Sequence, residues 1–205
     1  MGNSIVIFKR ELKSFFDSPM AYVFLVVFSL INGYFFTNTF FLYGQSDLRS
    51  LFSIIPLVYL FFIPGITMSL ISREKGLGTL EIISTLPIND RDIVIGKYLA
   101  ALALIIIALF TTSLHYITLI FVGSNIDHGA IFTAYLGIAL VGAVYASVGV
   151  FASSLTDNQV ISFIIAIAIV FVFWLMDKLL IFMPHSIAGI TQYLSVEFHL
   201  SNISR

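Results

Sequence analysis

The stretch YLAALALIIIALFTTSLHYITLIFVGSNI, residues Tyr98–Ile126, contains no Asp, Glu, Lys or Arg from its first residue to its last. A transmembrane helix needs about 20 consecutive, mainly apolar residues. A charged side chain at the centre of a bilayer costs about 2.5 to 3.5 kcal/mol on insertion scales. This stretch therefore predicts a helix that crosses a membrane.

The composition of the whole chain agrees with this prediction. Of 205 residues, 59% are hydrophobic and 10% are charged, and the mean hydropathy is +1.04, whereas soluble domains have about 25% charged residues. The absence of cysteine excludes a disulfide scaffold and thiolate metal sites. Ten Lys and Arg against 11 Asp and Glu leave no positive surplus for binding nucleic acid.

Charged residues divide the chain into five uncharged stretches that are long enough to span a bilayer. The expected fold class is therefore an all-α, polytopic integral membrane helix bundle over residues 20–176. Pro184 and Gly189 interrupt the apolar segment that follows, so we expect residues 177–205 to form an extracytoplasmic re-entrant or interfacial segment. The five expected helices lie near residues 20–41, 51–71, 98–122, 131–153 and 159–176.

The positive charges predict the orientation. Most of them precede the first span or lie in the loop 72–97, and cytoplasmic segments are enriched in Lys and Arg. The N-terminus and the loop 72–97 are therefore expected to face the cytoplasm. The residues on this side are Lys9, Arg10, Lys13, Arg73, Lys75, Arg91 and Lys97.

Residues 1–19 predict an amphipathic helix that lies on the cytoplasmic membrane surface. Apolar residues recur at helical spacing while Lys9, Arg10 and Lys13 take other positions. Asp17-Ser18-Pro19 would then turn the chain into the bilayer. The apolar positions are Ile5, Phe8, Leu12, Phe15 and Phe16.

The loop 72–97 predicts a short helix between two turns. Gly76 and Gly78 would end the helix of the second span, and Gly78 or Thr79 would cap a helix that runs through Leu86 to Pro87. Such a helix, fixed at both ends, is suited to transmit force to the bundle from a protein docked below it. The third span would be capped at one of two positions, Asn89 or Asp90.

The five spans contain no Asp, Glu, Lys or Arg, so they offer no relay of charged groups. His115 is either a proton or substrate contact or a neutral histidine hydrogen-bonded to another helix, and its isolation favours the second. The chain has neither a P-loop nor an intramembrane protease motif, so we expect no enzymatic activity. The candidate translocation-path or interhelical polar residues are Asn32, Asn38, Ser113 and His115.

Small residues recur along the fourth span, and a second small pair, Gly149 and Ser153, follows. Small side chains let two helices approach closely, either at a moving or dimer-forming interface or in static packing within one subunit, which is the commoner case. In the second span, Pro56 and Pro64 predict a kink, or a break near Pro64-Gly65. The small residues in question are Ala139, Gly142, Ala143, Ala146 and Ser147.

The pattern Glu74-Lys75-x-x-Gly78-Thr79-Leu80-Glu81 followed by Pro87 resembles the signature loop of ABC-2 type transporter permeases. The resemblance extends to Lys9-Arg10-Glu11-Leu12 with Ser18-Pro19 and to the order of the spans. His199-Leu-Ser-Asn-Ile-Ser-Arg205 resembles permeases of the gliding-motility-associated ABC transporter type.

This resemblance implies a permease subunit of an exporter in the bacterial cytoplasmic (inner) membrane. ATP and Mg would be bound by a separate ABC ATPase subunit, with no cofactor in this chain, and a second permease chain would complete the path. Glu74 and Glu81 would supply polar contacts to the ATPase, and Gly78 and Pro87 would set helix ends. The residues that match the family's coupling region are Glu74, Lys75, Gly78, Thr79, Glu81 and Pro87.

Family members usually have six spans, so five spans here predict either a chain truncated before its last helix, which we favour, or a sixth span at Leu179–Leu194 despite Pro184. Two other functions stay open. A non-transporting membrane scaffold would use the basic helix and charged loop to recruit envelope or cytoplasmic partners. A passive channel would need a polar helix face along a pore, for which the spans offer only scattered candidates.

Overall fold

The computed structural model describes residues 2–42, 48–85, 87–123 and 126–179, and in these ranges it consists of helices and short connections without a strand. The expected all-α class is confirmed. The helices are α1 (Gly2–Asp17), α2 (Pro19–Thr37), the π-helical η1 (Asn38–Leu42), α3 (Arg49–Thr67), α4 (Ser72–Gly76), α5 (Thr79–Ser84), α6 (Asp90–Val122), α7 (His128–Leu155) and α8 (Gln159–Leu179).

Five of these helical segments are long and apolar enough to cross a membrane, which confirms the expected spans. The third begins at Asp90, ahead of the expected residue 98, because hydropathy marks only the part of a helix that lies in lipid. Asn89, with extended backbone, is its N-cap residue. The five segments are Pro19–Phe41, Leu51–Gly76, Asp90–Val122, His128–Leu155 and Gln159–Met176. The segment expected at 177–205 lies, from residue 180 onward, outside the described residues.

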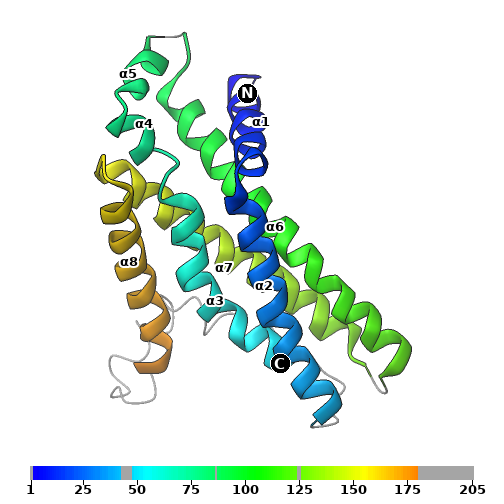
Figure 1. Cartoon of the computed structure of the whole chain (residues 1–205). Coiled ribbons are helices and arrows are strands. Elements are labelled where there is room, and N and C mark those ends of the chain that lie inside the picture. The colour runs from blue at the N-terminus through cyan, green and yellow to red at the C-terminus, as the bar shows by residue number, and fades with distance from the viewer. Residues whose placement is uncertain (1, 43–47, 86, 124–125, 180–205) are drawn as a thin grey trace.

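The spanning helices form one bundle around α3 (Figure 1). α3 packs against α2, α7 and α8, while α6 packs against α2 and α7. α3 is the most buried of the spans, and α2 and α8 are the least buried. The N-terminus, α4 and α5 all lie at the same end of the bundle (Figure 1), which we call the N-terminal end.

α3 continues through both of its prolines and ends at Thr67, so the break considered near Pro64-Gly65 does not occur. A helix in lipid must keep its backbone groups paired, and local adjustments around proline allow this. Near the end of the helix, the hydroxyl of Thr67 donates to the carbonyl of Ile63 at 2.8 Å, one turn earlier in the helix. The chain leaves the helix only at Met68, and α4 starts at Ser72.

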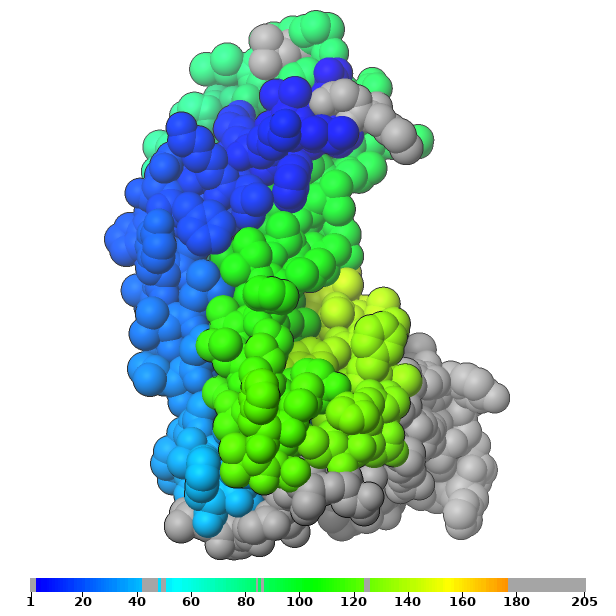
Figure 2. All heavy atoms as spheres, turned by 90° about the vertical axis from the view of Figure 1, so that its right-hand side faces the viewer, coloured from blue at the N-terminus to red at the C-terminus, as the bar shows by residue number. Residues whose placement is uncertain are grey.

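α1 lies along the first turns of α6 (Figures 1 and 2). The contact is close at Gly96, where a Cβ atom would lie 2.8 Å from the side chain of Ile7. The hydroxyl of Ser4 donates to the carboxylate of Asp92 on α6. α1 ends at Asp17 and Pro19 is the first residue of α2, so the helices break where the turn was expected. Of the expected apolar face, Phe15 is buried, Phe8, Leu12 and Phe16 are half-buried, and Ile5 is exposed.

Small residues of α7 allow close packing inside this one chain. At Gly149 a Cβ atom would lie 2.0 Å from Oγ1 of Thr67, and at Gly142 it would lie 2.9 Å from Ile105. This face of α7 therefore packs directly on α3 and α6. Of the other candidate packing residues, Ala146 is buried, Ala139 and Ala143 are half-buried, and Ser147 is exposed.

Candidate coupling site at the N-terminal end of the bundle

Four charged side chains from three helices meet at the N-terminal end of the bundle. Arg10 of α1 lies 2.5 Å from Glu11 and 2.8 Å from Glu74 of α4. Lys97 of α6 lies 3.1 Å from Glu11 and 2.9 Å from Oε2 of Glu74. Two cations and two anions thus alternate in one cluster, and their charges cancel. We call these four residues the charge cluster.

Lys97 is the innermost member of the charge cluster. Only 1% of its side chain is exposed, and its ammonium also donates to the carbonyl of Leu70 at 2.5 Å. Burying an unpaired ammonium group is very costly, so its stability there depends on the two carboxylates. Lys97 therefore joins α6 to α1 and to the segment that connects α3 with α4.

Arg10 is the outer cation of the charge cluster. Partial burial acts to lower the pKa of Arg10, but the hydrogen bonds and negative charges of Glu11 and Glu74 outweigh it, and the pKa is raised above its ordinary value. The guanidinium group therefore stays charged at every physiological pH. It links α1 to α4 as a permanent cation.

A buried serine of α7 holds the other side of α4. The Ser153 hydroxyl accepts hydrogen bonds from the backbone N–H groups of Ile71 and Ser72, each at 3.0 Å, and donates to the carbonyl of Met68 at 2.9 Å. The backbone groups between α3 and α4 would otherwise lack these partners in a buried position. A single side chain thus fixes the start of α4 on α7.

Two further contacts attach α4 to the end of α7. Nζ of Lys75 donates to the carbonyl of Ser154 at 2.8 Å, where a cation also complements the negative end of the helix dipole. A Cβ atom at Gly76 would lie 2.7 Å from the carbonyl oxygen of Asp157, so only glycine allows this approach. Lys75 and Gly76 therefore place α4 against the α7–α8 connection.

Gly78 separates α4 from α5, as expected. Its φ of 68° lies in the left-handed region, where glycine pays no steric penalty, and it is the N-cap residue of α5. The hydroxyl of Thr79 donates to the carbonyl of Glu74 at 3.2 Å. α5 ends at Ser84, earlier than expected, with Thr85 as its C-cap, and Pro87 lies in a bend. Leu86 lies outside the described residues.

α5 projects from the bundle at its N-terminal end (Figure 1). Leu77 and Ile82 are 67% and 66% exposed, and the carboxylate side chain of Glu81 is exposed beside them. Leu80 packs back, half-buried, against the core, and Ile83 is half-buried as well. α4 is thus held by the bundle, whereas α5 presents apolar and acidic side chains outward.

Three of the four candidate polar residues of the spans bond within their own helices. Asn32, Asn38 and Ser113 each donate a hydrogen bond to a carbonyl group of their own helix. His115 stacks on Phe36 of α2 with ring centroids 4.8 Å apart. His115 therefore contacts another helix through its ring face.

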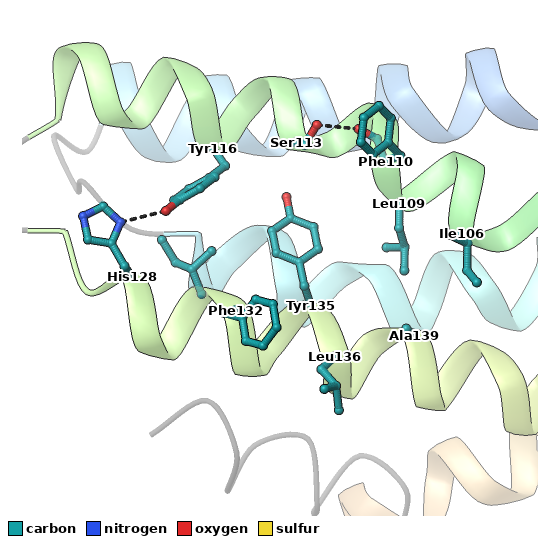
Figure 3. A pocket seen from close by; sticks show the side chains of 11 residues that line it. Ile106, Leu109, Phe110, Ser113, Tyr116, His128, Phe132, Tyr135, Leu136 and Ala139 are labelled. Atoms are coloured by element: carbon teal, nitrogen blue, oxygen red, sulfur yellow. Dashed lines mark hydrogen bonds between the residues drawn. The ribbon is translucent and has the colours of Figure 1, made fainter.

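A mainly apolar cavity of about 440 Å³ lies between α6 and α7 (Figure 3). Ser113 lines it, but its hydroxyl is already bonded within α6. At one end, the Tyr116 hydroxyl lies 2.7 Å from Nδ1 of His128. The cavity thus offers space for hydrocarbon and few free polar groups.

Comparison with protein families matches residues 5–200 to the family described as ABC-2 family transporter protein. The chain belongs to this family. Neither curated proteins nor solved structures give a match. The family match covers nearly the whole chain of this ABC-2 family member, and its multiple spanning helices make it a multi-pass membrane protein. The match does not distinguish the gliding-motility type expected from His199–Arg205, which lie outside the described residues.

The residues predicted from the sequence to form the coupling region lie in or beside α4 and α5. Their partners on α1, α6 and α7 were not predicted. In the sequence, Arg10, Glu11 and Lys97 stand out only as charges or as part of a family resemblance, and Ser153 only as a small residue. One available signal was Lys97 itself, which directly precedes the uncharged stretch of the third span. A lysine at that depth needs a carboxylate partner.

Proposed function

We propose that this ABC-2 family member is the permease subunit of an exporter, which moves its substrate with ATP hydrolysed by a separate subunit. The ATPase subunit would bind ATP and Mg and dock on α5 and the residues beside it. A second permease chain would complete the translocation path, in the bacterial cytoplasmic membrane, with the N-terminal end of the bundle facing the cytoplasm.

The observation that supports this proposal is the contrast between α4 and α5. α4 is bonded to α1, α6 and α7 through Arg10, Lys97 and Ser153. α5 follows it directly and exposes Ile82 and Glu81. A displacement of α5 by a docked protein would therefore move α4 and, through α4, several spanning helices at once.

The two acidic residues of the loop differ in surroundings. Glu81 is exposed and available to a partner, so we assign it to the ATPase contact, together with Leu77 and Ile82. Glu74 is held by Arg10 and Lys97, so we assign it to positioning α4. Its expected direct contact with the ATPase remains a prediction.

The polar residues of the spans favour a path between two chains over a pore within one. Asn32, Asn38 and Ser113 already use a polar group inside their own helices. A pore within the chain would need such groups to face a common channel. We therefore place the path at the contact between two permease chains.

Co-purification tests the proposal. The chain is expressed in membranes with a candidate ABC ATPase sought among the neighbouring genes, and retention of the ATPase is measured for wild type and for Glu81→Lys combined with Ile82→Ser. We expect the variant to lose the ATPase while inserting into the membrane normally. Asp17→Lys, an acidic-to-basic change at an exposed site of α1, serves as the matched control and should retain it.

Retention of the ATPase by the α5 variant would contradict docking at this surface. If the intact chain never binds an ATPase but captures envelope or cytoplasmic proteins, the non-transporting scaffold replaces the permease. Equal loss in the Asp17→Lys control would show a general effect of charge at this end and would also contradict the proposal.

A further inference from the structure

We propose that the chain binds an anionic phospholipid in a composite site at the N-terminal end of the bundle. Its phosphate would lie against Arg73, and one acyl chain would follow a groove over α3 between α2 and α8. Glu81 and Ile82 of α5 do not line this site, and Leu77 is the one residue of the proposed ATPase contact at its edge. Its occupancy requires no ATPase.

The polar part of the site is a hollow of about 610 Å³ between α1, α4 and the start of α8. Arg73 lines it from α4 and Gln159 from the first position of α8. The first turn of a helix carries a partial positive charge that favours anions. The other polar residues around the hollow are Arg10, Glu11, Ser14, Ser18, Ser69 and Glu74.

The charge balance of the hollow favours an anion. Glu11 and Glu74 are neutralised by Arg10 and Lys97 within the charge cluster. Arg73 is exposed and has no ion pair or hydrogen bond through its side chain in the part of the chain that the structure describes. Arg73 therefore gives the hollow a net positive charge. Among the described residues the N–H groups of its guanidinium are unpaired, and their planar arrangement matches the oxygens of a phosphate.

An apolar groove of about 630 Å³ adjoins the hollow. The two share Pro19 and Met20 in their linings, so the polar space leads into the apolar one. The groove lies between α2, α3 and the first turns of α8. Its remaining lining residues are Val23, Phe24, Phe61, Phe62, Gly65, Ile66, Met68, Val160 and Phe163.

This juxtaposition selects the chemistry of the occupant. An anionic head group with a hydrocarbon tail fills both spaces, and a membrane supplies it as a phospholipid at the surface where basic residues attract anionic lipids. A free phosphate would use only the polar hollow. A neutral lipid would fill the groove and leave Arg73 without a partner.

Quenching by brominated lipid measures the occupancy. The chain has one tryptophan, Trp174, so Trp174→Phe with Phe163→Trp places a single reporter in the groove. The full chain is reconstituted in vesicles of phosphatidylcholine with increasing dibromo-phosphatidylglycerol or dibromo-phosphatidylcholine. We expect a preference for phosphatidylglycerol of about two- to five-fold, the size of one exposed ion pair.

Arg73→Gln should reduce this preference to about one, because it removes the charge that contacts the phosphate. Arg91→Gln, an equal loss of charge at an exposed residue of the same end that does not line the hollow, should leave the preference unchanged. Phe61→Trp, at another residue of the groove, is a second reporter in case Phe163→Trp perturbs the fold. It should show the same preference for phosphatidylglycerol and the same effects of the two arginine substitutions.

Three results would overturn the proposal. Equal quenching by the two lipids would show that the groove has no head-group selectivity. An equal loss in Arg91→Gln would assign any preference to general surface charge. Loss of the preference on adding soluble glycerol phosphate would show a site for free phosphate esters. None of these results depends on the ATPase, so they leave the proposed docking at α5 to its own experiment.

Discussion

Nζ of Lys97 lies 2.9 Å from Oε2 of Glu74, although the two residues lie at opposite ends of the loop expected to couple this ABC-2 family member to its ATPase. The same lysine lies 3.1 Å from Glu11. The charged loop is therefore closed on itself and bound to α1. This closure makes the position of α4 dependent on a few identifiable contacts.

Replacing Lys97 with methionine should lower the stability of the fold by about 3 kcal/mol, because two carboxylates lose their buried counter-charge. Thermal unfolding of the purified chain in detergent, followed by far-UV circular dichroism, measures the effect. Lys13→Met, at an exposed residue of α1, should change little.

The pair is tested by adding Glu74→Gln to Lys97→Met. Arg10 then balances Glu11, and the double variant should be more stable than the sum of the two single effects. Strict additivity would show that Lys97 and Glu74 do not interact energetically.

The contribution of Arg10 should not vary with pH. A group whose pKa is raised on folding stabilises the fold at every pH below its pKa in the unfolded chain, and the pKa of Arg10 is raised from an already high value. Arg10→Gln should therefore lower the unfolding temperature by a similar, small amount from about pH 6 to pH 9, where arginine is always charged. A difference that grows or vanishes within this range would show that another titrating group controls the contact.

Ser153→Ala should cost about 1 to 3 kcal/mol, because two buried N–H groups between α3 and α4 lose their acceptor. Amide hydrogen exchange at Ile71 and Ser72 should accelerate with the loss of stability. The matched control is Ser154→Ala, whose hydroxyl only bonds the carbonyl of Phe151 in its own helix. Equal exchange in both variants would contradict the assigned role of Ser153.

Gly149→Ala should destabilise the bundle by about 1 to 3 kcal/mol, because the added methyl group would overlap Thr67 and force α3 and α7 apart. Gly129→Ala, where the nearest atom to the new Cβ is 3.4 Å away, should be tolerated. Thermal unfolding distinguishes the two, and unchanged stability of Gly149→Ala would show that this helix contact is not tight.

Gly78→Ala should cost about 1 kcal/mol, and Gly78→Asn less, because asparagine tolerates the left-handed conformation better than alanine. No atom lies within 4 Å of a Cβ atom at this position, so the cost is conformational and not steric. Unfolding temperatures of the two variants provide the measurement. An equal effect of both would indicate that α5 starts in another conformation in solution.

The number and approximate positions of the spanning helices followed from the sequence, because exclusion of charge from lipid is a local requirement that each stretch meets by itself. The turn at Ser18-Pro19 and the interruption at Gly78 were predictable for the same reason, since both depend on backbone preferences of single residues. The small residues of α7 indicated close packing but not which helices they contact.

The tertiary structure alone decided which residues around α4 act together. Arg10 lies 64 positions before Glu74 and Lys97 lies 23 positions after it, and no local pattern relates them. Ser153 carries no charge, yet its hydroxyl accepts hydrogen bonds from two backbone N–H groups of a turn that is distant in sequence. Hydropathy and backbone preference are properties of a segment, whereas an ion pair or a buried hydrogen bond depends on where several helices meet.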